Sequence, residues 1–375
     1  MSNASEALVA EALALPPVSP EAAAGYRGAG DVLVRAVDDA LAARRDLGDL
    51  LGGNPLEVMR ANHRNHHRFL STVLRLGDFE LLARILPWVY RAYRAHGFSY
   101  DYFPVELRAW AMALEARLPP DHGAALLPAY RWMLRAHPAT VEAAESVAAG
   151  PLPLRPPREP EVGRLVDCLL DGRTRDCVAL AEAACRTQHD LRNVYQKLLQ
   201  PALYEVGRRW EAGEISVAEE HLATAVAGRM MTALYGRLTP PARARRLRAV
   251  VTCAPNEHHE VGARMVADLL ELEGWDVRYL GADTPAGDVL ALLESWLPRV
   301  LCLSVCVPYN LEAAADLVTA VRGDPVLRAT KILVGGLAFA WSTALWQRLG
   351  ADAYAPDAGA AADVVRAWFP SVERP

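Results

Sequence analysis

Short apolar runs alternate with amphipathic segments through the last third of the chain. The run at 247–253 has the continuity of a buried parallel strand, and residues 260–274 follow the spacing of an amphipathic helix that a glycine closes. Further strands are expected at 275–281, 300–307, 331–334 and 351–355, with helices at 285–297, at 310–321 and after the last strand. This alternation predicts a Rossmann-like, doubly wound parallel sheet over residues 244–375.

The chain before that sheet carries helical periodicity. Residues 21–148 predict an all-α, globin-like domain, and residues 161–243 predict a four-helix bundle. Residues 149–160 hold five prolines in twelve positions, which favours a stiff Pro-rich linker. Residues 1–20 are rich in Ala, Ser, Pro and Glu and are expected to form a flexible tail or one frayed helix. The expected fold class is therefore multidomain, α plus α/β.

Composition and charge narrow the functional classes. The net charge of −5 comes without a long block of like charge, and no apolar stretch approaches the length of a membrane span. The first residues lack a basic segment of the kind that opens a signal peptide, so we expect a cytoplasmic protein with no membrane partner. Residues 1–167 contain no cysteine, so a chromophore there could not be held through a thioether.

One segment of the first domain places histidines where apolar residues are expected. Six residues in steps of three and four predict a single core-facing stripe on a helix: Leu56, Met59, His63, His66, Leu70 and Val73. A single buried histidine is usually a satisfied core residue. Two on one stripe, with His67 beside them, favour a polar pocket instead.

A second set of polar residues and glycines falls at one edge of the predicted sheet. His259 follows the first strand, at the carboxyl edge where open α/β sheets bind ligands. A neutral imidazole can ligate a metal, and Glu257 can accept its other N–H. Gly262 leaves room at the start of the next helix, while Ser304 and Gly335-Gly336 follow later strands and could line a slot for a slender ligand tail. Taken alone, Glu-x-His-x-x-Gly also fits a solvated loop.

Together these residues resemble the cobalamin (vitamin B12) binding domain, whose pattern is Asp-x-His-x-x-Gly, then Ser-x-Leu, then Gly-Gly. The resemblance implies that His259 is the lower axial ligand of cobalt, with Ser304 and Gly335-Gly336 along the displaced nucleotide tail. This chain departs from the pattern twice. Glu257 replaces the Asp as a longer carboxylate, and Cys306 replaces the Leu.

The bundle carries a second resemblance. Trp210, nine intervening residues and Glu220-His221 are similar to the bundle motif of the cobalamin-dependent photoreceptors. That family implies adenosylcobalamin, with the Trp packed against the adenosyl group, the Glu hydrogen-bonded to it, and a cobalt–carbon bond that light breaks. In members that form a bis-histidine adduct the upper histidine directly follows the Trp. Here that position is Glu211, so a bis-histidine adduct is not expected from that position. His221 is a possible substitute for the upper histidine.

The first domain shows no helix-turn-helix with a basic recognition helix, so direct nucleic-acid binding is not expected. It resembles instead the all-α domain of the photocobilins, a subfamily that binds biliverdin beside cobalamin. By this resemblance biliverdin is bound non-covalently near His63, His66 and His67. The family implies a photoreceptor rather than an enzyme, in which light changes a homo-oligomer and thereby the activity of an unknown protein partner.

Two alternatives share the cobalamin domain. One is a corrinoid protein that carries methyl groups between methyltransferases. The other is a cobalamin sensor with haem in the first domain, where His63, His66 or His67 would be the axial ligand.

Overall fold

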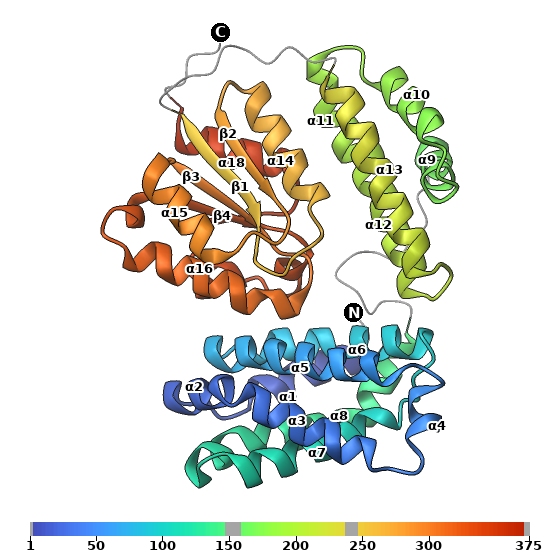
Figure 1. Ribbon diagram of the computed structural model, residues 1–375, viewed down its shortest axis with the longest axis vertical. Coiled ribbons are helices and arrows are strands. Elements are labelled where there is room, and N and C mark those ends of the chain that lie inside the picture. Colours follow the sequence, from blue (N-terminus) through green and yellow to red (C-terminus); the bar gives the residue numbers. More distant parts are fainter. Residues whose placement is uncertain (1–2, 147–158, 237–246, 371–375) are drawn as a thin grey trace. The chain divides into compact units, whose positions relative to one another are not determined.

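The chain folds into two compact units. The computed structural model describes residues 3–146, 159–236 and 247–370 (Figure 1). One unit comprises Met1–Leu154 with Glu211–Gly213, and the other comprises Arg155–Trp210 with Glu214–Pro375. The predicted linker at 149–160 lies outside the described residues except for its last two positions.

The first unit is helical throughout its described elements, as predicted. Its helices are α1 (Asn3–Leu13), α2 (Pro20–Gly28), α3 (Gly30–Ala42), α4 (Leu47–Leu51), α5 (Leu56–Leu76), α6 (Phe79–Ala95), α7 (Tyr102–Arg117) and α8 (Pro120–Glu145). Gly77, at φ 61°, ends α5, and the Asp78 side chain caps α6 by accepting a hydrogen bond from Leu81 N at 3.0 Å.

Of the two alternatives predicted for residues 1–20, the flexible tail was wrong for most of the segment, and the helix is present but packed rather than frayed. Residues 3–13 form α1, in which Leu8 and Ala12 are buried. Their spacing of four places both on one face of the helix, and burying that face fixes the segment. Trp132 Nε1 on α8 also donates a hydrogen bond to Glu11, at 3.3 Å.

The second unit begins with the helical bundle. Its elements are α9 (Pro160–Leu170), α10 (Thr174–Ala184), α11 (Leu191–Val194), a π-helical turn η2 (Tyr195–Leu199), α12 (Gln200–Glu211) and α13 (Val217–Tyr235). Ser216 and Glu219 form a capping box at the start of α13, since each side chain accepts a hydrogen bond from the other residue's backbone N–H. The predicted third helix therefore contains a π turn that its sequence did not indicate.

A parallel five-stranded sheet follows the bundle, in the order β2-β1-β3-β4-β5. The strands are β1 (Arg248–Cys253), β2 (Asp276–Gly281), β3 (Val300–Ser304), β4 (Lys331–Gly335) and β5 (Ala353–Ala355). The helices α15 (Ala286–Trp296) and α16 (Leu311–Gly323) cover one face, and α14 (Val261–Leu272) and α18 (Ala358–Trp368) cover the other (Figure 1). The short helix α17 (Leu345–Leu349) precedes β5. The strand order reverses between β1 and β3, which is where ligands bind in such sheets.

One apolar core joins the bundle to the sheet. Buried residues of the bundle, including Leu199 and Met230, belong to the same cluster as Ala267 of α14 and Val365 of α18. The two parts are therefore packed as a single unit. Among the helices in the described ranges, none combines the length and apolar character needed to cross a bilayer.

Candidate functional site

The loop after β1 fixes one imidazole and leaves its outer nitrogen available. His259 Nδ1 lies 2.5 Å from Glu257 Oε1, and the His259 backbone N–H donates to the same oxygen at 3.0 Å. Because an ionised carboxylate only accepts, Nδ1 carries a proton, and in the neutral imidazole Nε2 therefore carries the lone pair. The His259 side chain is 56% exposed. Within the described part of the chain, Nε2 has no hydrogen-bond partner.

Glu257 holds this loop in place. Its side chain is fully buried, and its Oε2 accepts hydrogen bonds from the backbone N–H groups of Cys306 and Val307 at 2.8 and 2.9 Å. Burial alone would raise the pKa of Glu257, but the hydrogen bonds and the charge of His259, together with the hydrogen bond from the Val307 amide, outweigh it and lower the pKa to about 2. The ionised Glu257 in turn raises the pKa of His259.

Asn310 belongs to the same network, although sequence reasoning missed it. Its Nδ2 donates to Glu257 Oε2 and to the carbonyl oxygen of Asn256, both at 3.1 Å, and the side chain is 3% exposed. The signal that could have indicated it is a polar residue just before α16, at the carboxyl end of β3. Asn310 ties the β1 loop to the β3 loop and so holds Glu257 in place.

The structure brings Ser304 and the glycine pair to the same edge. Ser304 is paired with Cys253 on one side and Gly335 on the other, at the ends of their strands. Gly336 has φ 96°, and a Cβ there would lie 2.2 Å from Val305 O, so the fold itself requires glycine. A Cβ at Gly262 would meet nothing within 4 Å. The start of α14 beside His259 is therefore open.

The end of the bundle bears the second set of predicted residues. Trp210 is partly buried near the end of α12, and Glu220 lies in the first turn of α13, where its Oε1 accepts a hydrogen bond from Thr224 Oγ1 at 2.8 Å. Glu220 is one of the charges that raise the pKa of His259. His221 is 74% exposed, and its Nε2 lies 3.6 Å from Glu220 Oε2. Glu211 forms an ion pair with Arg91.

The residues at this sheet edge suit a metal ion that is already bound by most of its ligands before it reaches the protein. The described residues gather no three His, Cys, Asp or Glu side chains into a metal site. A lone oriented imidazole beside open space, with its second nitrogen held by a carboxylate, suits a metal whose equatorial positions are filled by a macrocycle. The residues at this edge therefore fit a corrin bound through His259.

The histidines of the first unit form a cluster with aromatic residues, in which His63 and His67 are buried and His66 is half-buried. His63 is fully buried, with Nδ1 2.5 Å from Asp38 Oδ1 and Nε2 2.8 Å from Tyr102 OH. His66 Nε2 lies 3.2 Å from Tyr130 OH, and His67 Nε2 lies 3.0 Å from Tyr26 O. The three histidines thus lie together as predicted.

The predicted stripe was wrong at its first residue, because Leu56 is 37% exposed at the start of α5. Both nitrogens of His63 are hydrogen-bonded, so binding haem iron there would break one of those contacts. Glu106, which the sequence did not single out, is buried in the same cluster and accepts a hydrogen bond from Trp110 Nε1 at 3.1 Å.

Acidification is expected to destabilise the first unit. Burial lowers the pKa of His66 to about 3 and lowers that of His67 from the same ordinary value of 6.5. The unfolded chain therefore binds more protons than the folded one once the pH falls below 6.5. Each such histidine then lowers the free energy of unfolding by up to about 1.4 kcal/mol per pH unit. Glu106, whose pKa burial raises, takes up its proton first in the folded state and offsets part of this loss.

Denaturant unfolding of the full chain at several pH values, followed by tryptophan fluorescence, measures this slope. Wild type should lose stability between pH 6.5 and 5, and His66→Gln should lose less. A transition that is independent of pH in both proteins would contradict the buried, neutral state of His66.

Comparison with known proteins identifies the second unit. Two family models match it, each described as a B12 binding domain: one covers residues 162–235 and the other covers residues 247–365. The second unit binds cobalamin. Its bundle and its sheet are thus the two parts of one B12-binding unit.

Relatives include two repressors of Myxococcus xanthus, both 32% identical to this chain. The HTH-type transcriptional repressor CarA matches over 51% of this chain and 65% of its own length, and the repressor CarH matches over 43% and 52%. The chain thus spans about half to two thirds of these relatives. These matches support the resemblance to the cobalamin-dependent photoreceptor family.

Corrinoid proteins of methanogens are also similar to this chain. The dimethylamine corrinoid protein of Methanosarcina barkeri is 22% identical over 54% of this chain and 93% of that protein. The solved structure of the monomethylamine corrinoid protein of the same organism is 21% identical over 55% of this chain and 97% of that one, with a TM-score of 0.48.

Replacing Asn310 is expected to loosen the Glu257 network. Asn310→Ala removes one donor from a buried carboxylate, which should cost about 1–2 kcal/mol of the stability of the second unit and up to about tenfold in cobalamin affinity. Asn310→Asp should be worse on both measures, because it places a second carboxylate against Glu257. Urea unfolding and cobalamin titration measure the two effects. Wild-type values for both variants would contradict this role of Asn310.

Proposed function

We propose that the chain is a light-sensing regulatory protein, not an enzyme, that binds adenosylcobalamin between its bundle and its sheet. The observation that supports this most is the exposed imidazole of His259, which Glu257 orients at the carboxyl edge of the sheet, in the same unit as the bundle end that bears Trp210 and Glu220. His259 Nε2 would ligate cobalt from below. Trp210 offers an apolar plate for the adenine ring above, and the Glu220 carboxylate can accept hydrogen bonds from ribose hydroxyls.

Adenosylcobalamin supplies a cobalt–carbon bond that visible light breaks. Trp210 and Glu220 would lose their contacts to the departing adenosyl group and repack. Such a differential contact is what a switch requires. The change would alter a homo-oligomer and, through it, an unidentified protein partner. Direct contact with nucleic acid is not part of this proposal.

A comparison of dark and illuminated protein tests the light response. Purified protein loaded with adenosylcobalamin in the dark should change its visible spectrum and its elution volume after green illumination. Protein loaded with aquacobalamin, which lacks the adenosyl group, is the control and should change in neither respect. An unchanged spectrum of the adenosylcobalamin-loaded protein would rule out the proposed function.

The first unit is proposed to bind biliverdin without a covalent bond. Support comes from the polar and aromatic cluster around His63, His66 and His67, which offers hydrogen-bonding groups and flat faces to a tetrapyrrole. Protein produced with biliverdin should absorb broadly in the far red and release the pigment on unfolding. A sharp Soret band would indicate haem, and no pigment at all would refute both versions.

A second candidate function is a carrier of methyl groups between methyltransferases. The similarity to the dimethylamine corrinoid proteins favours it. Competition between methylcobalamin and adenosylcobalamin separates the two functions, because a methyl carrier should show no preference for the larger upper ligand. A clear preference for adenosylcobalamin would exclude the carrier.

A further inference from the structure

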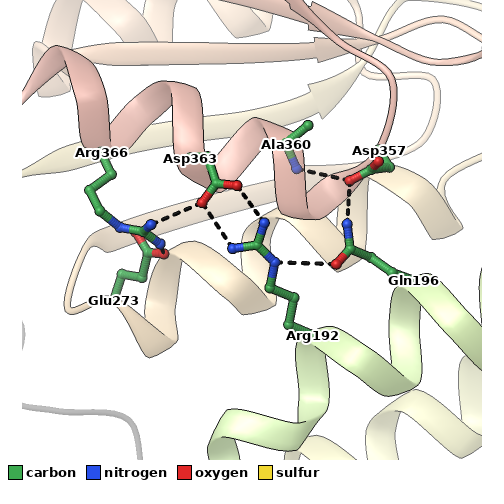
Figure 2. A network of polar contacts seen from close by, with 7 residues as sticks. All are labelled: Arg192, Gln196, Glu273, Asp357, Ala360, Asp363 and Arg366. Carbon is green, nitrogen blue, oxygen red and sulfur yellow. Dashed lines mark hydrogen bonds and ion pairs between the residues drawn. The ribbon is translucent and has the colours of Figure 1, made fainter.

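Polar contacts hold one end of the bundle to the sheet domain. The Arg192 guanidinium on α11 donates to both carboxylate oxygens of Asp363 on α18, at 2.9 and 2.5 Å (Figure 2). Its Nε also donates to Gln196 Oε1 at 3.2 Å, and Gln196 Nε2 donates to Asp357 Oδ1 at 2.6 Å. The two bundle residues therefore hold each other as well as α18. We call Arg192 and Gln196, with Asp357 and Asp363, the anchor.

The α18 side of the anchor is fixed within the sheet domain. Asp357 is the N-cap of α18 and accepts a hydrogen bond from Ala360 N at 2.8 Å. Asp363 is also held by Arg366, whose Nη1 donates to it at 2.9 Å, and Arg366 pairs in turn with Glu273 (Figure 2). Both acceptors are thus oriented before the bundle residues reach them.

Gly359 allows the close approach on which the anchor depends. It is buried at the second position of α18, and a Cβ there would lie 2.3 Å from Gln196 Nε2 and 2.7 Å from Arg192 Nε. A side chain at 359 would therefore push against both bundle side chains, and a large one must move them away from their carboxylates. Glycine at this point costs helix stability, since alanine is the better helix former. Its presence is explained by the contact.

Part of the anchor lies in the π turn of the bundle. Gln196 belongs to the π turn η2, and its neighbour Tyr195 donates a buried hydrogen bond to Asp268 on α14 at 2.5 Å. Successive residues of the π turn thus contact two different helices of the sheet domain. Irregular turns of this kind are frequent at functional sites.

From the anchor, one helical run leads to Trp210. The η2 turn continues directly into α12, which ends one residue after Trp210. At about 1.5 Å per residue, the run from Gln196 to Trp210 spans roughly 20 Å. At the far end the start of α13 is open to solvent, with Val217 52% exposed and Leu222 42% exposed. The position of Trp210 therefore depends on how Gln196 is held at the start of this run, as well as on the Arg91–Glu211 ion pair at its end.

We propose that Arg192 and Gln196 are positioning residues, which hold α12 so that Trp210 lies above the corrin and thereby set the preference for a large upper ligand. This inference rests on the proposed cobalamin function. Loss of the anchor should remove the contribution of the bundle to binding. The contribution of His259 and the tail slot should remain.

Gly359→Leu tests this without touching any residue that contacts the ligand. The matched control is Gly287→Leu, at the second position of α15, where a Cβ would meet nothing within 4 Å and the residue is exposed. Dark titrations of the full chain with adenosylcobalamin and with aquacobalamin give the two dissociation constants. Gly359→Leu should lose about tenfold in affinity for adenosylcobalamin and change little toward aquacobalamin. Gly287→Leu should match wild type for both.

The outcomes separate the two proposals. If wild type itself shows no preference for adenosylcobalamin, the proposed function fails. If wild type shows the preference and Gly359→Leu keeps it, the anchor does not position Trp210. Should Gly359→Leu fail to fold, the pair Arg192→Gln with Gln196→Ala is measured instead. Its control is Arg322→Gln, which breaks the ion pair with Asp352 inside the sheet domain and shares no contact with the anchor. The pair must lose the preference while the control retains it.

Discussion

His259→Ala should abolish tight cobalamin binding and leave the folded protein intact. A buried carboxylate orients this imidazole so that its outer nitrogen faces outward at the sheet edge, and removing the imidazole deletes the proposed axial bond. Loss of residues that only support a metal ligand costs about 10–100-fold in affinity. Loss of the ligand itself should cost roughly 100-fold or more. Titration with aquacobalamin, followed by absorbance, measures the loss.

The neighbouring His258 provides a matched control. It is exposed on the same loop and has no place in the Glu257 network. His258→Ala should bind cobalamin as wild type does and unfold within about 1 kcal/mol of it, as surface substitutions do. His259→Ala should stay folded and lose about 1–2 kcal/mol, because it removes one donor from buried Glu257. Equal affinity of the two variants would contradict the assignment of His259.

Glu257→Ala should have the largest effect on stability. The carboxylate accepts five hydrogen bonds, from His259 N and Nδ1, Cys306 N, Val307 N and Asn310 Nδ2. Removing it leaves the backbone donors of the β3 loop buried without an acceptor. At about 2 kcal/mol for each of these two donors, the second unit should lose about 4 kcal/mol. Urea unfolding of the apoprotein measures this.

Glu257→Gln tests the role of the charge on Glu257, because glutamine has nearly the same shape as glutamate and is neutral. The amide keeps one acceptor oxygen, but its NH2 group must face donors on the other side, whichever way it is turned. This variant should therefore unfold between wild type and Glu257→Ala, and its cobalamin affinity should fall about 10–100-fold because His259 is no longer oriented by a charge. If Glu257→Gln were as stable as wild type, the ionised state of Glu257 would not be what holds the two loops together.

The sequence predicted the parts of this protein whose pattern is local. Alternation of apolar runs and amphipathic helices gave the parallel sheet, and the order of strands brought His259, Ser304 and Gly335 to one edge. The capping box at Ser216 also follows from local chemistry, because both partners lie within one helical turn.

Features that depend on packing between distant segments could not be predicted. Asn310 and Glu106 matter because other helices and loops bury them, and a single polar residue in a helical pattern carries no sign of that burial. Gly262 and Gly336 look alike in the sequence. Yet the backbone of Val305 requires glycine at 336, while the space around 262 is open. The π turn likewise belongs to a segment whose pattern is that of an ordinary helix.

Electron paramagnetic resonance of bound cobalamin reduced to Co(II) tests the central claim most directly. The unpaired electron couples to the nucleus of the lower axial nitrogen, so 14N splits the signal into triplets and 15N into doublets. With protein labelled with 15N only in histidine, wild type should show doublets and His258→Ala should show the same. Triplets in the labelled protein would mean that the ligand nitrogen comes from the cofactor's own base, and His259 would not be the lower ligand.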